Sequence, residues 1–236
     1  MQGRLIERPC NDFPCSNMAI QALFFDLDGT LTDPKIGITR SFQYALEKLG
    51  ETVPAVEDLL WCIGPPLRES FAQLLIAHDD TLINVAVSHY RERYNVVGKF
   101  ENSVYDAIPD ALQRLQARGI ALYVATSKLR SFAVEILEHF QLALYFQEIF
   151  GSDADGRHAD KRELLAHALA AARLDAACCG MVGDRKFDMI GAAANGVCGI
   201  GVTYGYGSRA ELLNAGARHL ADTPGDICHI LTQMTS

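Results

Sequence analysis

The chain has 236 residues, of which 49% are hydrophobic and 21% are charged, enough to bury the core of one large domain or of one domain that carries an insertion. Its net charge of −8 leaves no general basic surface for nucleic acid or anionic lipid. No apolar run approaches the roughly 20 residues that span a bilayer, so we expect neither a nucleic-acid partner nor a membrane partner.

The N-terminal residues and the cysteines give a first indication of organisation and compartment. Residues 1–17 lack the apolar centre of a secretory signal, and we expect them to form an N-terminal extension before a folded domain that begins near Met18. The chain has seven cysteines and no CxxC pair, which favours reduced, mostly buried thiols in a cytoplasmic protein. Cys10 and Cys15 have no histidine nearby, which argues against a metal site there.

The first expected strand is "AIQALFFD" (residues 19–26), an apolar run that ends against Asp26 and Asp28. Two carboxylates this close raise each other's pKa unless a cation or hydrogen-bond donors offset the repulsion. Mg²⁺ is a suitable cation, and beside it Asp26 can act as a nucleophile and Asp28 as an acid and base. Gly29 allows the backbone to turn tightly beside a substrate. The alternative is an ordinary turn after a strand.

The next 70 residues or so have helical spacing and no convincing strand. They include "ITRSFQYALEKLG" (38–50), "LRESFAQLLIAHD" (67–79) and "LINVAVSHYRERYNVV" (82–97). The segment is too long and too regular for a loop, so we predict a helical insertion. Because the insertion begins directly after the carboxyl end of the first strand, we expect it to cover that end of the sheet.

Apolar strands then alternate with helices along the rest of the chain. We expect strands at "IALYVAT" (120–126), "CCGMVGD" (178–184) and "VCGIGVT" (197–203), and helices at "DALQRLQARG" (110–119), "RSFAVEILEHF" (130–140) and "KRELLAHALAAARL" (161–174). This alternation predicts an α/β fold, a Rossmann-like parallel sheet with helices on both faces. Ligands of such sheets bind beyond the carboxyl ends of the strands.

Thr126 and Ser127 stand at one of those ends, about three residues before a helix. A hydroxyl group and free amides at a helix start suit a phosphate oxygen. The alternative is a simple helix cap, for which these residue types are preferred.

The stretch "GRHADKRELL" (residues 156–165) places basic residues at the start of an expected helix, where they are disfavoured. Asp160 and Glu163 resemble a capping box, which places Lys161 in the first helical turn, where the helix dipole disfavours a cation. Such a conflict is typical of a functional residue, here one that neutralises a phosphate and the nucleophile. The alternative is a solvated lysine.

In "MVGDRKFDMIGAAANG", a strand ends at Gly183 and Asp184 is expected to open a helix, with Asp188 one turn further on the same face. Asp184 can then bind the metal ion directly, and Asp188 can hold a ligand of the ion from outside. A helix cap would explain Asp184 but not Asp188.

This order of motifs resembles the haloacid dehalogenase-like hydrolase superfamily, and within it the phosphoglycolate phosphatase-like group with a helical cap. The resemblance rests on the DxDGT motif at residues 26–30, on Thr126, on Lys161, and on the GDxxxD motif at residues 183–188. It implies a core formed by residues 18–33 and 106–236 and a cap formed by residues 34–105.

Roles for individual residues follow from the same resemblance. Asp26 would be the nucleophile that forms an aspartyl-phosphate, Asp28 the acid and base, and Thr126 and Lys161 the catalytic residues that hold the phosphoryl group. Mg²⁺ would be bound by Asp26, by Asp184 and by the backbone carbonyl of Asp28. Asp188 would hold one of these ligands or a coordinated water without contacting the ion itself. The implied substrate contacts are Gly29, Thr30, Ser127 and Arg68, with Arg40 and His158 as further possible contacts.

The resemblance implies a Mg²⁺-dependent phosphatase, a monomer or a homodimer, acting on a small phosphorylated metabolite. The stretch "DGRHADK" resembles a subgroup with "DGTRxxK", whose members are known as phosphoglycolate phosphatases or 5′-nucleotidases. 2-Phosphoglycolate is therefore the first expected substrate and a 5′-nucleotide the second. A phosphosugar mutase and a non-catalytic regulator that binds a phosphorylated ligand are the alternatives. The glycines of "GIGVTYGYG" (199–207) are expected to shape a loop beside the site.

Overall fold

The computed structural model describes residues 19–75 and 79–234. The predicted extension, including Cys10 and Cys15, lies outside the described residues. The described cysteines are all buried, as predicted: Cys62, Cys178, Cys179, Cys198 and Cys228.

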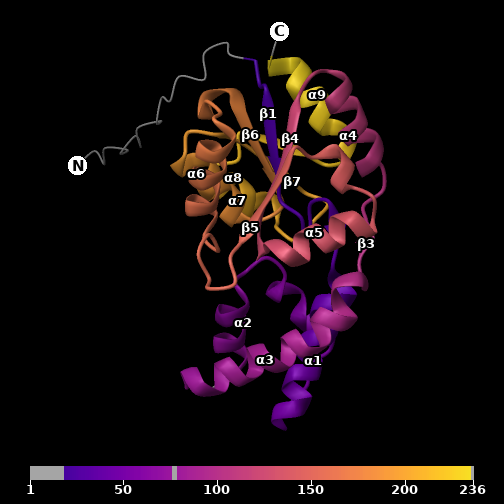
Figure 1. Cartoon of the computed structure of the whole chain (residues 1–236), viewed down its shortest axis with the longest axis vertical. Coiled ribbons are helices and arrows are strands. Elements are labelled where there is room, and N and C mark those ends of the chain that lie inside the picture. The colour runs from indigo at the N-terminus through magenta and orange to yellow at the C-terminus, as the bar shows by residue number, and fades with distance from the viewer. Residues whose placement is uncertain (1–18, 76–78, 235–236) are drawn as a thin grey trace, which may run out of the picture.

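A six-stranded parallel sheet in the order β5-β4-β1-β6-β7-β8 forms the centre of the molecule and confirms the predicted fold class (Figure 1). Its strands are β1 (Ala22–Phe25), β4 (Ala121–Leu129), β5 (Glu148–Ser152), β6 (Cys179–Gly183), β7 (Cys198–Val202) and β8 (His219–Ala221). β5 and β8 were not among the predicted strands. Strand β1 lies in the middle because its side chains are buried on both faces of the sheet.

Successive side chains of β1 point into two different cores. Leu23 and Phe25 pack with residues of α4 (Ile108–Ala117), α5 (Arg130–His139) and α9 (Pro224–Met234), whereas Ala22 and Phe24 pack with residues of α6 (Lys161–Ala172) and α7 (Lys186–Ala194). Figure 1 shows α4 and α9 on one side of the sheet and α6 and α7 on the other. The remaining short elements are α8 (Arg209–Asn214) and the 3₁₀ turns η1 (Glu57–Cys62), η2 (Gly98–Phe100), η3 (Ala143–Tyr145) and η4 (Ala176–Cys178).

A helical insertion lies at one end of the molecule (Figure 1) and consists of α1 (Lys35–Leu49), α2 (Leu67–Leu74) and α3 (Asp80–Val96). It has its own apolar core, in which the rings of Phe42 and Phe71 lie 4.7 Å apart and Tyr90 packs edge-on against both. The three rings hold the helices together because each is nearly or fully buried.

Two short strands join the insertion to the sheet domain, although the sequence predicts no strand in this segment. β2 (Thr32–Asp33) pairs antiparallel with β3 (Ser103–Val104), so the chain enters and leaves the insertion side by side. Two-residue strands are too short to give a period-two pattern, which is why the sequence did not reveal them. The Asn102 side chain donates to Thr32 Oγ1 at 3.1 Å and closes this ribbon.

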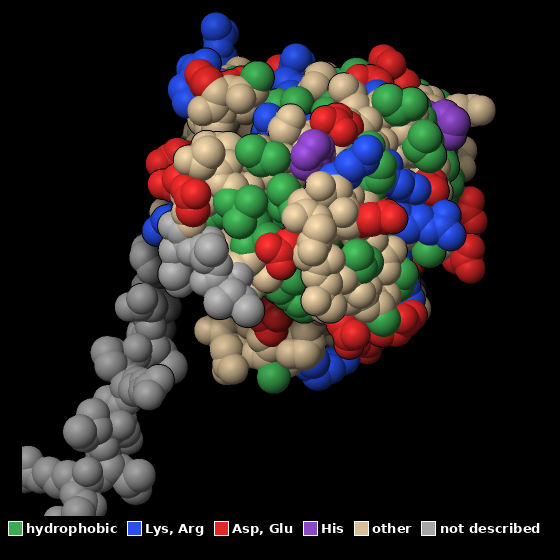
Figure 2. Space-filling view, turned by 90° about the horizontal axis from the view of Figure 1, so that it is seen from below, with side chains coloured by type: hydrophobic (Ala, Val, Ile, Leu, Met, Phe, Trp, Pro, Cys, Tyr) green, Lys and Arg blue, Asp and Glu red, His purple; other side chains and the backbone are tan. Residues whose placement is uncertain are grey.

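Viewed from the end that carries the insertion, acidic and basic side chains are interspersed over the surface (Figure 2). Among the helices of the described residues, none is long and apolar enough to cross a membrane.

Candidate active site

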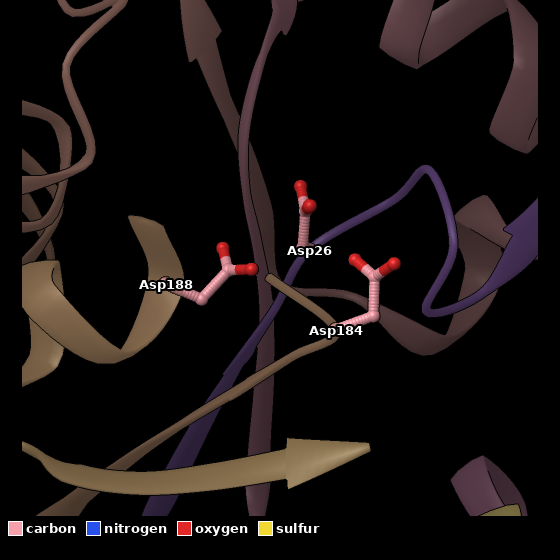
Figure 3. Close-up of side chains that lie close together, drawn as sticks. All are labelled: Asp26, Asp184 and Asp188. Atoms are coloured by element: carbon pink, nitrogen blue, oxygen red, sulfur yellow. The ribbon is translucent and has the colours of Figure 1, made fainter. Parts of the chain in front are cut away.

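The carboxyl ends of β1 and β6 bring the predicted acidic residues together. Asp26 follows β1, Asp184 follows β6, and Asp188 projects from the first turn of α7 (Figure 3). One carboxylate oxygen of each lies within 4.8 Å of the other two, and all three residues are buried. Neighbouring parallel strands end at the same edge of the sheet, which places residues far apart in sequence around one point.

Lys161, at the first position of α6, lies between Asp26 and Asp188. Its Nζ donates to the carbonyl oxygen of Ala125 at 2.8 Å and lies 2.8 Å from Asp26 Oδ1 and 2.6 Å from Asp188 Oδ1. Burial alone would lower the pKa of Lys161, but Asp188 and Asp26 outweigh it and raise the pKa. The cation at an unfavourable helix position is therefore held by three oxygen partners, and Asp160 caps the helix as predicted by accepting from the amide of Arg162 at 2.8 Å.

Asp184 precedes α7 instead of opening it, because the helix begins at Lys186. Its Oδ2 accepts from the amide of Tyr206 at 2.7 Å, in the glycine-containing loop that was expected beside the site. Burial, and then the charge of Asp188, raise the pKa of Asp184 well above its ordinary value. Asp188 Oδ2 accepts from the amide of Arg185 at 3.1 Å, and burial raises the pKa of Asp188 to about 6.

Asp28 lies apart from these three carboxylates and faces Lys128, a residue that the sequence analysis did not select. Lys128 Nζ is 2.7 Å from Asp28 Oδ2, and the two side chains are only 8% and 13% exposed. Burial raises the pKa of the Asp28 carboxyl although Lys128 opposes the shift. The sequence pattern did not reveal Lys128, because the register of β4 with β5 shifts between Thr126 and Leu129 and regular alternation along the strand is lost there.

The site has more carboxyl groups than ammonium groups, which favours the binding of a metal cation. Three buried carboxylates (Asp26, Asp184 and Asp188) and the partly buried carboxylate of Asp28 face only two ammonium groups, those of Lys161 and Lys128. Asp184 Oδ1 and Asp28 Oδ1 are also buried without a hydrogen-bonding partner among the described residues. A hard divalent cation supplies the missing positive charge and takes carboxylate oxygens as ligands, so the residues present fit such an ion.

A cavity of about 350 Å³ lies between the sheet edge and the helical insertion and reaches Asp26, Asp28 and Lys161. Thr126 and Ser127 line it from β4. The insertion contributes an apolar wall that includes Ile38, Phe42, Val87, Tyr90 and Tyr94. The insertion also contributes Arg68 and Arg91, so the cavity has a carboxylate-rich end at the strand ends and a wall on the insertion that combines apolar and basic side chains.

Several predicted substrate contacts lie elsewhere. Gly29 packs against Asp184 and Thr30 is fully buried, and neither lines the cavity. Arg68 does line it, but its guanidinium group donates to Asp80 Oδ1 at 3.0 Å and to Asn84, within the insertion.

Of the two further contacts considered, neither reaches the cavity. Arg40 pairs with Glu101 at 3.1 Å, and His158 lies 3.2 Å from Asp153 and stacks on His167. Both side chains sit beyond the residues that form the cavity wall.

Arg185 is a second cavity residue that the sequence analysis missed. It donates to Glu211 Oε1 at 3.0 Å and to the carbonyl oxygen of Ile63 in the insertion, so it links the residue after Asp184 to the helical unit. No local pattern indicates this contact, because its partners are far away in sequence.

Fold, motif order and site geometry agree with one family. The chain belongs to the haloacid dehalogenase-like hydrolases, since the model of that family matches residues 23–202. This confirms the family that the motifs predicted.

Similar proteins include several phosphatases. The chain is 50% identical to a 5′-nucleotidase of Pseudomonas aeruginosa over 80% of its own length and 86% of the relative's, and 31% identical to a phosphoglycolate phosphatase of Aliivibrio fischeri over 79% and 86%. It is 39% identical to the tyrosine-protein kinase PtkA of Mycobacterium tuberculosis, covering 82% of this chain but 65% of that protein. A solved structure of a predicted phosphatase from Clostridium acetobutylicum is 40% identical, with a TM-score of 0.85 over 92% of this chain and 99% of that one.

Proposed function

We propose that this protein is a Mg²⁺-dependent phosphatase that hydrolyses a small phosphorylated metabolite through an aspartyl-phosphate on Asp26. The observation that carries the proposal is that four carboxyl groups share only two ammonium groups at one end of a cavity large enough for a small molecule. Asp26 and Asp184, with the backbone carbonyl of Asp28, would hold the ion. Bound there, Mg²⁺ would neutralise the nucleophile and the phosphate oxygens during the attack.

In the first step an oxygen of Asp26 forms a bond to phosphorus while the bond from phosphorus to the leaving oxygen breaks. Lys161 stands 2.8 Å from Asp26 and can accompany the negative charge from the carboxylate to the phosphoryl group. Asp188 holds Lys161 in that position from its other side.

Asp28 transfers the protons. In the first step it gives a proton to the leaving oxygen, and in the second it takes one from the water whose oxygen bonds to phosphorus and releases Asp26. Thr126 and Ser127, on the cavity wall, supply a hydroxyl group and an amide to the phosphoryl oxygens. The helical insertion covers the cavity and keeps bulk water from the aspartyl-phosphate.

Of the two substrate classes that the sequence suggested, the cavity favours a 5′-nucleotide over 2-phosphoglycolate. Its volume of about 350 Å³ falls in the range of sites for whole small molecules, and the rings of Phe42, Tyr90, Tyr94 and Phe132 lie on its wall. Aromatic side chains suit a flat base. Arg91 also lines the cavity and has no ion pair among the described residues, so the carboxylate of 2-phosphoglycolate has one cation that it could contact. The Pseudomonas aeruginosa relative, named a 5′-nucleotidase, supports the choice of a 5′-nucleotide.

The test is phosphate release from a panel of 5′-nucleotides, 2-phosphoglycolate and bisphosphorylated sugars, with Mg²⁺ or with EDTA. We compare the wild type with Asp26→Asn and with Asp222→Asn, a surface change that keeps the chemistry of the substitution but lies outside the cavity. Turnover that needs Mg²⁺ and is lost only in Asp26→Asn is the expected result. Turnover that persists in Asp26→Asn, with mass spectrometry excluding reversion to aspartate, would disprove the assignment of the nucleophile.

A further inference from the structure

Lys128 connects the proposed acid and base to the helical insertion. Its Nζ lies 2.7 Å from Asp28 Oδ2, donates to the hydroxyl oxygen of Tyr94 in α3, and stands 4.8 Å from the centroid of the Tyr94 ring. Tyr94 is itself fixed, since its ring stacks on Tyr90 and packs against Phe132 of α5. The lysine is thus held between a residue of the sheet edge and a residue of the insertion.

The partners of Lys128 differ from those of Lys161, the other buried lysine of the site. Lys161 directs its donors to Ala125, Asp26 and Asp188, the residues around the nucleophile. Lys128 instead contacts the carboxylate that transfers the protons. The two lysines therefore lie beside different carboxylates, Lys161 beside the proposed nucleophile Asp26 and Lys128 beside the proposed acid and base Asp28.

The two oxygens of Asp28 have different surroundings. Oδ2 is fixed by Lys128, whereas Oδ1 is buried and has no hydrogen-bonding partner among the described residues. Asp28 also lines the cavity, and Oδ1 is the one of its two carboxylate oxygens that no described residue engages. A carboxyl group fixed at one oxygen presents the other in one orientation, which proton transfer requires.

We propose that Lys128 is a positioning residue that aims Asp28 Oδ1 at the leaving oxygen, and that Tyr94 makes this aim depend on the docking of α3 against the sheet domain. The inference rests on the function proposed above. In the first step the proton passes from Oδ1 to the leaving oxygen as the bond from that oxygen to phosphorus breaks. The resulting Asp28 carboxylate stays paired with Lys128 until it takes a proton from water.

The test compares two leaving groups of similar shape and different basicity. Phenyl phosphate releases a basic oxygen that needs a proton, and p-nitrophenyl phosphate releases one that needs it far less. Lys128→Met should therefore lower kcat/KM on phenyl phosphate by at least about tenfold more than on p-nitrophenyl phosphate, because general acid catalysis contributes roughly 10²–10⁴-fold. Tyr94→Phe removes one partner of the lysine and should change the two rates in the same direction by a smaller factor.

Lys99→Met is the matched control. The side chains of Lys99 and Lys128 are both 8% exposed, and Lys99 also lies where the insertion meets α5, but it pairs with Glu135 and not with Asp28. It should lower both rates equally or not at all.

An equal loss on both substrates in Lys128→Met would overturn the inference, because the lysine would then act on the phosphoryl group or on the fold. If Lys128→Met does not fold, Tyr94→Phe decides by the same comparison. A wild type that releases no phosphate from any compound would overturn the proposed function and this inference together. An active wild type with equal losses on the two substrates in Lys128→Met would overturn this inference alone.

Discussion

Replacement of Gly29 by alanine tests whether the position of Asp184 determines activity. Gly29 has a φ of 80°, and a Cβ atom added to it would lie 2.6 Å from the carboxylate carbon of Asp184. Gly119 has nearly the same backbone, with a φ of 79°, and no atom lies within 4 Å of an added Cβ. Gly119→Ala therefore imposes the same backbone strain without the steric contact.

The expected magnitudes separate the two effects. Positive φ costs an L-residue roughly 1–2 kcal/mol, so each variant should melt about 2–8 °C below the wild type. In Gly29→Ala the carboxylate carbon of Asp184 must also withdraw by at least about 0.8 Å, from 2.6 Å to the 3.4 Å at which ordinary contact begins, and its Oδ2, which lies closer still, must withdraw further. A displacement near 1 Å in a catalytic site costs on the order of 10²-fold in rate.

The assay is kcat/KM for Mg²⁺-dependent phosphate release, with the melting temperature measured on the same samples. We expect Gly119→Ala to retain wild-type activity and Gly29→Ala to lose about 10²-fold while melting at a similar temperature. Equal activity in the two variants would refute the reasoning, since it would show that Asp184 has room to move or that its position does not matter.

Three further predictions concern charge and packing. The hydrogen bonds from Arg93 lower the pKa of Glu101, so the ion pair stabilises the protein above pH 4.5, the ordinary glutamate pKa, and this contribution is lost as the pH falls below that value. The melting temperatures of Glu101→Gln and of the wild type should therefore differ at neutral pH and converge in acid. A difference that stays constant with pH would contradict this prediction. Without divalent ions Asp184→Asn should raise the melting temperature near neutral pH, because it removes a buried charge without a counter-ion, and added Mg²⁺ should then stabilise only the wild type in a thermal-shift assay. Phe71→Ala should lower the free energy of unfolding in urea by roughly 3–5 kcal/mol, because the side chain is fully buried between Phe42 and Tyr90, and a loss below about 1 kcal/mol would show that the insertion repacks.

Asp26 and Asp184 could be found from the sequence because each directly follows an apolar strand, and Asp28 and Asp188 lie two and four positions after them. Asp26 and Asp184 needed no long-range information, only the rule that parallel strands end at one edge of the sheet. Lys161 was detectable for a different reason, namely its unfavourable position at the start of a helix.

The residues that were missed or misplaced depend on contacts between distant segments. Tyr206 binds Asp184 across 22 positions, and Arg185 reaches Ile63 across 122. Arg68 was expected to read the substrate, but α3 supplies carboxylate and amide partners that engage it. Such partners become neighbours only when distant segments of the chain fold together, and no periodicity within one segment encodes them.

The ribbon formed by β2 and β3 brings the two covalent connections of the helical insertion to one place. Thr32 pairs with Val104 and Asp33 with Ser103, so the two chain crossings lie about 5 Å apart. The chain therefore leaves the sheet domain and returns to it at nearly the same point, so the connection does not depend on the length of the inserted segment. A unit of another shape, whose own termini lie as close together, can replace α1 to α3 without displacing β1 or α4, and would present a different wall to the same four carboxylates.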